Sequence, residues 1–247
     1  MIESLATTIA ADVVKRIALS VPKSIDKWRF ARFFGPPAVT GEGFRAVVDP
    51  YTHPAPRTGN RYIKRFMDKR PDQPLVGEDN VLGVNVIRLI SYTAALFSSF
   101  TKNHMSIPIV ADYDVAALWD SSFICFGSSD SNLKTYDIET LPEQKYYKLT
   151  FGPDGHRGFE VGGKHFGFEG RRDRAIILKM RNPRHPEHLL FVCAGLGEWG
   201  TTGATYYLFD RWKDLYKQHG LKPFLKIVEV EVGVDQSAKE IYSEQFE

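Results

Sequence analysis

Apolar positions along the chain fall into short runs with strand character and longer stretches with helical spacing. The predicted strands are 44–51, 107–110, 122–126, 174–183, 188–196 and 224–233, and most of them lead into turns that contain Gly, Ser, Thr or Pro. The predicted helices between them are 80–100, 112–119 and 203–220. Apolar strands that lead into a small-residue turn and then a helix are typical of parallel sheets. We therefore predict an α/β fold, a mainly parallel sheet with helices on both faces.

The length of 247 residues suits one α/β domain spanning 1–247, because no linker separates two units. Within it we predict an N-terminal helical arm at 1–35, a long surface loop at 52–79 rich in Pro, Gly and charge, and an antiparallel hairpin insertion at 145–168. One helical face of the arm is apolar and should cover the domain's own core or a second subunit. Its residues are Ile2, Leu5, Ile9, Val13 and Ile17.

The last predicted strand alternates apolar and charged positions. Leu225, Ile227 and Val228 are interleaved with Lys226 and Glu229. Such alternation indicates an edge strand with one solvated face.

Composition and charge limit the kinds of ligand and the cellular compartment that we expect. The formal net charge of +2 gives no support to binding of nucleic acid. The two cysteines, Cys125 and Cys193, lie in apolar runs and are expected to be buried thiols in a reducing compartment. No run reaches about 18 apolar residues, and acids interrupt the first helix, which argues against a membrane span and a secretory signal. We expect a cytoplasmic protein that does not enter the membrane.

Two predicted strands end in glycine-rich turns, "FGSSDSN" at 126–132 and "AGLGEWGTTGA" at 194–204. Glycine lets backbone N–H groups approach an anion, and a following helix N-terminus adds partial positive charge. The two turns together form a candidate cradle for a phosphate or carboxylate if their strands are neighbours. The proposed binding residues are Gly127, Ser128, Ser129, Asn132, Gly195, Gly197, Trp199, Gly200, Thr201 and Thr202.

The second turn fits the dinucleotide-binding pattern G-x-G-x-x-G once, as "GLGEWG". The acid that should follow about 20 residues later at the end of a strand is missing, and no Lys-Ser/Thr follows as in a P-loop. The alternative interpretation is a turn whose glycines only let a helix pack closely on the sheet.

Two acids in these turns are candidate catalytic residues. Glu198, beside Trp199, could act in cleavage of an N-glycosidic bond, and Asp130 has the same potential. Each also has a structural interpretation, as a capping acid for Glu198 and as an Asx-turn residue for Asp130. We predict no metal site, because no His stands at ligand spacing before Glu198 and "RHPEH" has the character of a solvated turn.

The turn "FGSSDSN", the strand "AIILKMRNP" and the stretch "LLFVCAGLGEWGTTGATYYL" together resemble a poorly characterised Rossmann-like domain of bacterial regulatory and antiviral defence proteins. The resemblance covers about residues 105–232, and "GSSDSN" departs from the Gly-Gly-Pro form of that domain's turn. It implies a Rossmann-like sheet and association with nucleotides, and it supplies no catalytic residue and names no cofactor.

The expected function is a sensor or regulatory module that binds a nucleotide-like or phosphorylated small molecule. It would act with a companion protein or as a homo-oligomer. Two alternatives stay open: a nucleotide or nucleoside N-glycosidase or related hydrolase that uses Glu198 or Asp130, and a non-catalytic structural subunit whose glycine turns only pack.

Overall fold

The structure of the protein is a computed structural model that describes residues 24–49, 83–101, 107–115, 118–152 and 155–246. Residues 1–23 of the predicted arm and the whole predicted loop 52–79 lie outside this part. The helices are α2 (Ser24–Phe34), α3 (Pro37–Thr40), α5 (Val84–Ser98), α6 (Asp112–Val115), α7 (Leu133–Glu139) and α8 (Glu198–His219). No helix in the described part of the chain is long and apolar enough to cross a membrane.

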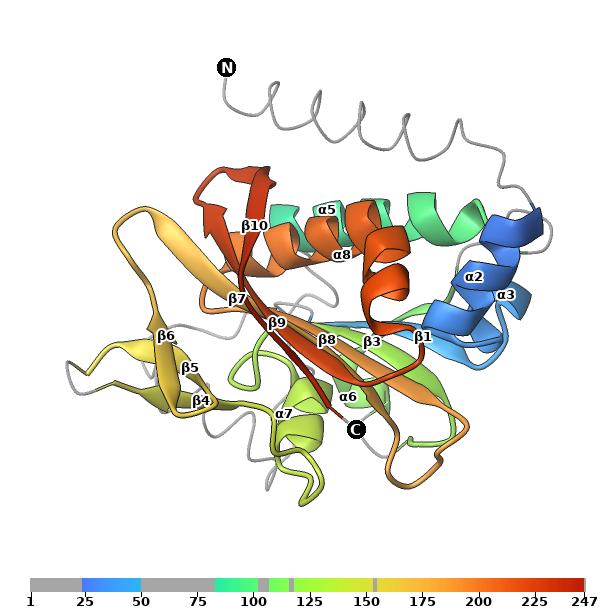
Figure 1. Cartoon of the computed structure of the whole chain (residues 1–247), viewed down its shortest axis with the longest axis horizontal. Coiled ribbons are helices and arrows are strands. Elements are labelled where there is room, and N and C mark those ends of the chain that lie inside the picture. The colour runs from blue at the N-terminus through green and yellow to red at the C-terminus, as the bar shows by residue number, and fades with distance from the viewer. Residues whose placement is uncertain (1–23, 50–82, 102–106, 116–117, 153–154, 247) are drawn as a thin grey trace, which may run out of the picture.

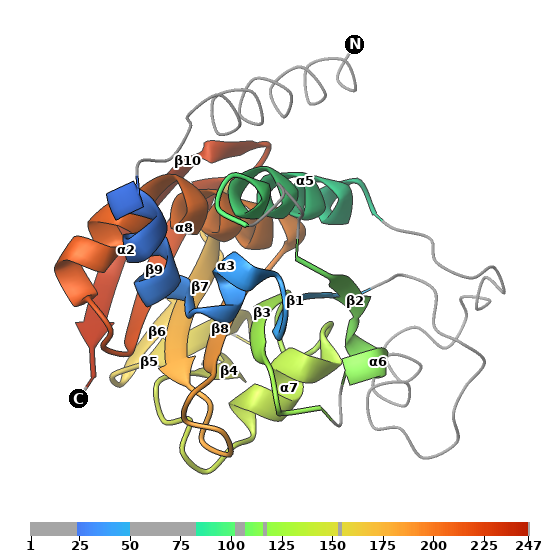
Figure 2. The same ribbon diagram turned by 90° about the vertical axis from the view of Figure 1, so that its right-hand side faces the viewer.

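A seven-stranded sheet in the order β10-β9-β7-β8-β3-β1-β2 runs through the molecule (Figures 1 and 2). Its strands are β1 (Phe44–Val48), β2 (Ile109–Ala111), β3 (Ser122–Phe126), β7 (Arg172–Arg181), β8 (Leu189–Gly195), β9 (Phe224–Glu231) and β10 (Val234–Gln245). Strands β8, β3, β1 and β2 pair in parallel, whereas β7, β9 and β10 pair antiparallel. The predicted mainly parallel, Rossmann-like sheet is therefore wrong, and the sheet is mixed.

The reason lies in the connections. The predicted strands at 174–183 and 188–196 are joined by a short turn, so β8 returns beside β7 as a hairpin instead of crossing over through a helix. Strands β9 and β10 are also joined by a tight turn, with Gly233 at φ 101°. A near-continuous apolar run shows that a strand is buried on both faces, and it does not show the strand's direction.

The predicted edge strand at 224–233 is an interior strand, because β10 pairs along its outer side. Lys226, expected on a solvated face, is fully buried. Its ammonium donates to Glu240 at 2.7 Å, to Ser243 at 2.9 Å and to Gln218 at 3.1 Å. A buried charge is tolerated when it is paired and fully hydrogen-bonded, and β10 supplies most of that pairing here.

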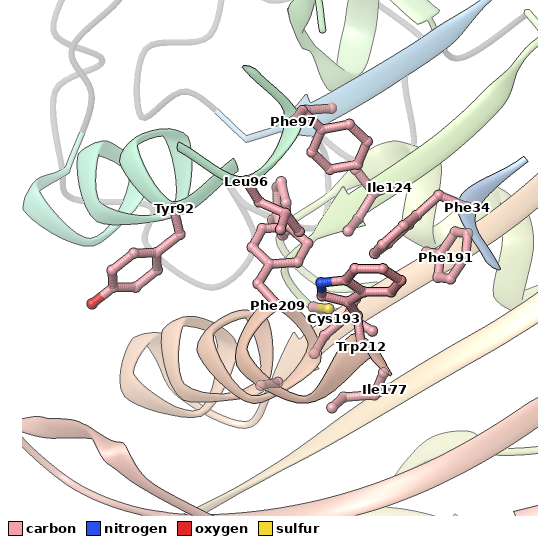
Figure 3. Close-up of a cluster of buried hydrophobic side chains, with 14 of the residues drawn as sticks. Phe34, Tyr92, Leu96, Phe97, Ile124, Ile177, Phe191, Cys193, Phe209 and Trp212 are labelled. Atoms are coloured by element: carbon pink, nitrogen blue, oxygen red, sulfur yellow. The ribbon is translucent and has the colours of Figure 1, made fainter. Parts of the chain in front are cut away.

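Both faces of the sheet are covered, as predicted. Helices α2, α5 and α8 pack on one face around an aromatic core that contains Phe34, Phe97, Phe191 and Trp212 (Figure 3). Helix α7 and a small sheet pack on the other face. Neighbouring residues of one strand point to opposite faces, so Ile124 belongs to the first core and Cys125 to the second. Both cysteines are buried and free.

The predicted hairpin insertion is a three-stranded antiparallel sheet. Its strands are β4 (Lys148–Phe151), β5 (Arg157–Val161) and β6 (Lys164–Gly167), in that order. Figure 1 shows this sheet beside the carboxyl ends of β3 and β8. It brings Arg157, at the start of β5, toward the turn that follows β3.

Candidate functional site

The two glycine-rich turns lie next to each other. Strands β3 and β8 are parallel neighbours, with Phe126 opposite Cys193 in the register. Gly127 continues the pairing, because its N–H donates to the Cys193 carbonyl at 3.0 Å. Since both turns follow the carboxyl ends of adjacent parallel strands, they share one edge of the sheet, the place where open α/β sheets bind ligands.

The backbone donors of the second turn already hold a carboxylate of the protein itself. Oδ2 of Asp173 accepts from the N–H of Gly200 at 2.6 Å and from the N–H of Gly197 at 3.1 Å. A Cβ atom at either glycine would come within 2.8 Å of this carboxylate. Gly197 and Gly200 therefore make room for Asp173, and the predicted anion cradle has an internal anion at two of its donors.

The turn is also part of the helix. The prediction starts the helix at Gly203, but α8 begins at Glu198, so Gly200, Thr201 and Thr202 form its first turns. The first N–H groups of a helix have no partner within the helix. Asp173 supplies that partner, and its negative charge interacts favourably with the positive end of the helix dipole.

Asp173 was not among the predicted residues, although the sequence contains a signal for it. In "RDRAIIL" it stands two and four positions before Ala175 and Ile177, on the face of β7 that packs under α8. Burial is the largest influence on the pKa of Asp173 and raises it to about 6. The hydrogen bonds from the Gly200 and Gly197 N–H groups and the charge of Arg157 lower the pKa and offset part of that rise.

The first turn holds a second carboxylate, Asp130, in a closed hydrogen-bond network. The Arg157 guanidinium contacts both carboxylate oxygens of Asp130, at 2.9 Å and 3.0 Å. The Ser128 hydroxyl donates to Oδ1 of Asp130 at 2.6 Å. Such a two-pronged arginine–carboxylate pair is a strong, oriented interaction. It ties β5 to the turn after β3.

Arg157 acts on both carboxylates, on Asp130 by direct contact and on Asp173 through its charge, which lowers the pKa of that group. Its side chain is 32% exposed, so the guanidinium lies at the surface of this edge. Its Nε is buried and makes no hydrogen bond to any described residue. Sequence spacing could not have found this pairing, because Arg157 belongs to an insertion far along the chain.

The other residues predicted in the first turn have structural partners. Asn132 caps α7: its side-chain oxygen accepts from Thr135 N–H at 3.0 Å and its amide donates to the Phe126 carbonyl at 3.0 Å. Ser128 and Ser129 are buried. Gly127 has φ 110°, a conformation that side chains rarely adopt, so glycine is required where the chain leaves β3.

Glu198 and Asp130, the two predicted catalytic acids, have partners on opposite faces of the sheet. Glu198 is exposed and accepts a hydrogen bond from the Asn85 amide of α5, whereas Asp130 pairs with β5. Trp199, predicted to stack on a ligand, has the Arg88 guanidinium 4.5 Å from its ring centroid. The second turn therefore faces α5 on one side and Asp173 on the other.

The two threonines predicted to contact a ligand also bind within the protein. The Thr201 hydroxyl accepts from Gly195 N–H at 2.9 Å. The Thr202 hydroxyl donates to Asp235 at 2.7 Å. Asp235, at the start of β10, is fully buried and also accepts from Tyr92 at 2.8 Å and Arg88 at 2.5 Å. This unpredicted network joins α5, α8 and β10.

No group of three or more His, Cys, Asp or Glu side chains that could hold a metal ion occurs in the described ranges. The site offers an arginine that pairs with Asp130 and whose charge also acts on Asp173, with the Ser128 hydroxyl beside the pair. No protein-family model matches the chain, and no curated protein is significantly similar to it.

Proposed function

We propose that the protein binds a small phosphorylated or nucleotide-like ligand at the edge where the turns after β3 and β8 meet β5, and that it acts as a sensor or regulatory module with a partner protein. The observation that carries the proposal is the Arg157–Asp130 pair at the carboxyl ends of two adjacent parallel strands. A half-buried guanidinium at such an edge is a suitable partner for a phosphate group.

The internal carboxylate changes how a phosphate would bind. Because Asp173 already accepts from Gly197 and Gly200, a phosphate at those N–H groups would have to displace it or meet its charge. Arg157 is the better partner, since its geometry matches phosphate as well as carboxylate. When a phosphate takes Arg157, Asp130 is released to accept hydrogen bonds from ligand hydroxyls such as those of a ribose.

A ligand screen on variants of Arg157 tests this proposal. Thermal unfolding of the wild type should shift with mononucleotides, dinucleotides or cyclic nucleotides, and a ligand at 100 times its Kd should add about 2.7 kcal/mol of stability. Arg157→Gln should abolish the shift. Arg172→Gln is the matched control, because Arg172 is a more exposed arginine of the same region that pairs with Glu229; it should keep the shift.

Two outcomes would contradict the proposal. Equal shifts in the wild type and Arg157→Gln would place the ligand elsewhere. A folded wild-type protein that responds to none of these ligands would favour the structural subunit, whose glycines serve packing and Asp173 alone.

One observation favours the alternative of an N-glycosidase or related hydrolase. Asp130 and Asp173 both interact with Arg157, and the pKa of Asp173 is raised to about 6, within the range useful for proton transfer near neutral pH. If the protein is such a hydrolase, Asp173→Asn should remove turnover of a bound nucleotide, because it removes the acid with the raised pKa. Glu198→Gln should keep turnover, because Glu198 faces α5. Equal activity in all three proteins would exclude Asp173 as the catalytic acid.

A further inference from the structure

The outward face of α5 has an unusual composition. The helix lies on the outer side of the molecule, next to α8 (Figures 1 and 2). Its single charged residue, Arg88, points inward and is buried. Val84 and Ile87 are 69% and 52% exposed. An outer helix of a globular protein normally carries charged residues on its solvent side, so this face has the character of a covered one.

Small residues continue this face toward the end of the helix. Ser91, Ala94 and Ser98 follow Ile87 at helical spacing and are half-buried. The Ser91 hydroxyl donates to the Ile87 carbonyl at 2.8 Å, and the Ser98 hydroxyl donates to the Ala95 carbonyl at 3.3 Å. Both hydroxyls are turned onto the helix backbone, so they do not prevent close packing of another helix. We call Val84, Ile87, Ser91, Ala94 and Ser98 the α5 face.

The segment before α2 has the sequence to cover this face. Residues 1–23 lie outside the described part, and their sequence carries the apolar stripe Ile2, Leu5, Ile9, Val13 and Ile17. They connect to α2 at Ser24, and α2 contacts the C-terminal end of α5: the Phe30 ring stacks on Phe100 at 4.1 Å and meets Phe97 at 5.3 Å. Chain that leads into α2 is therefore tethered close to that end of the α5 face.

We propose that residues 1–23 dock on the α5 face as an amphipathic helix that runs parallel to α5. Fifteen residues separate Ile2 from Ile17, which gives ~22 Å of helix, and α5 itself is about as long. The direction follows from the tether, since the end nearest Ser24 must lie near Ser98. The stripe then places its large residues over the small ones of α5, with Ile9 at Ser91, Val13 at Ala94 and Ile17 at Ser98.

This pairing accounts for both the apolar stripe of residues 1–23 and the uncharged α5 face. Large side chains over small ones let two helices approach closely, because ridges on one fill the grooves of the other. The short tether favours this segment over a second copy of the chain, because it holds the stripe at high local concentration beside the face. Helix α5 also contacts the start of α8, where Asn85 binds Glu198 and Arg88 lies over the Trp199 ring.

Thiol labelling of the full chain tests the docking. Ser91→Cys introduces a reporter thiol on the α5 face. Background labelling should be low, because Cys125 and Cys193 are fully buried and burial raises the pKa of both thiols. In the otherwise wild-type chain carrying Ser91→Cys, the docked segment should slow the reaction of this thiol with a maleimide. Adding Ile9→Asp and Val13→Asp should raise the rate by about tenfold or more, as expected for loss of local protection.

The matched control is Ala11→Asp, which adds a charge on the opposite side of the same helical pattern and should leave the rate unchanged. Equal rates in all three proteins would overturn the proposal. A second measurement distinguishes docking of residues 1–23 of the same chain from docking of a second copy. The pair Ile9→Cys and Ser91→Cys should form a disulfide within one chain. The control pair Ala11→Cys and Ser91→Cys should not. A disulfide between two chains would overturn the proposal in favour of a second copy.

Discussion

The carboxylate of Asp173 accepts a hydrogen bond of 2.6 Å from the backbone N–H of Gly200, and the two residues require each other. A side chain at position 200 would put its Cβ 2.8 Å from the carboxylate. Without the carboxylate, the first N–H groups of α8 would lose their buried acceptor. This relationship explains two glycines of the turn by the protein's own chemistry, and it leaves Arg157 as the cation that an external anion could use.

Protonation of Asp173 should make stability depend on pH. Its pKa of about 6 in the folded protein lies above its ordinary value of 3.8, so the folded state holds the proton more tightly. The resulting stabilisation is complete below about pH 4 and is lost as the pH rises through 6. The difference corresponds to about 3 kcal/mol. Relative to the wild type, Asp173→Asn should therefore gain about that much unfolding free energy between about pH 4 and pH 7.

Urea unfolding of both proteins across this pH range measures the effect. The comparison cancels the contribution of Asp112, a second buried carboxyl whose pKa burial raises to about 6 and which both proteins retain. Parallel stability curves would show that Asp173 does not titrate in the way its burial requires.

Gly203 should be intolerant of a methyl group because α8 lies close to β9 there. A Cβ at Gly203 would come within 2.5 Å of both methyl groups of Val230. We expect Gly203→Ala to lower the free energy of unfolding by about 1–3 kcal/mol. Val230→Ala removes those methyl groups, so the double variant should lose less stability than the two single variants added together.

Denaturant unfolding of this cycle gives the coupling directly. Gly167→Ala is the control, because a Cβ there would meet its neighbours at ordinary distances of 3.5 Å or more and should change stability little. Strict additivity would mean that α8 can shift away from β9 at low cost.

Removal of Asp235 should be costly because it leaves the buried guanidinium of Arg88 without its partner. We expect Asp235→Ala to lower the free energy of unfolding by about 3–5 kcal/mol. Asp214→Ala breaks an exposed pair with Lys217 on the surface of α8 and should cost less than about 1 kcal/mol. Chemical denaturation of the two variants compares them, and equal losses would show that the α5–β10 network is not stabilising.

Lys179 should give the opposite pH dependence to Asp173. It is buried in the aromatic core, where its ammonium donates to the Gly220 carbonyl at 3.1 Å and lies 4.4 Å from the Phe33 ring. Burial lowers its pKa from 10.5 to about 7, so the unfolded chain binds the proton more tightly and stability rises with pH above 7.

Lys179→Met should remove this rise. Between about pH 7 and pH 9.5 the wild type should gain about 3 kcal/mol of unfolding free energy relative to the variant. Thermal or denaturant unfolding at the two pH values measures it. A difference that stays constant with pH would mean that the amine reaches water in the folded protein.

The pattern of apolar residues predicted a strand correctly where the strand depends only on its own residues. The apolar run at 122–126 predicted β3 with its bounds, and the run at 188–196 predicted β8, because burial on both faces leaves no room for polar side chains. Strand direction was missed, since it depends on whether a connection is a hairpin or a crossover. The alternation at Lys226 suggested solvent, whereas β10 binds that ammonium inside the sheet.

The residues of the candidate site also fall into those that the sequence pattern could identify and those that it could not. The two small-residue turns could be found from sequence because each follows a strand directly. Asp173 and Arg157, which complete the site, are distant along the chain from the groups that they bind, and no spacing rule connects them. The start of α8 was misplaced because Gly200 suggested a turn, whereas it lies in the first turn of the helix, where Asp173 accepts a hydrogen bond from its N–H.

The mixed sheet also sets an order of assembly. Strands β8, β7, β9 and β10 and helix α8 all come from residues 172–245 and connect through short links, so they can pair without closing a long loop. The parallel strands must instead join β1 to β2 and β3 across a gap of about sixty residues and then add to the open side of β8. In a chain made from its N-terminus, β1, β2 and β3 are synthesised before β8, the strand that joins them to the antiparallel half of the sheet.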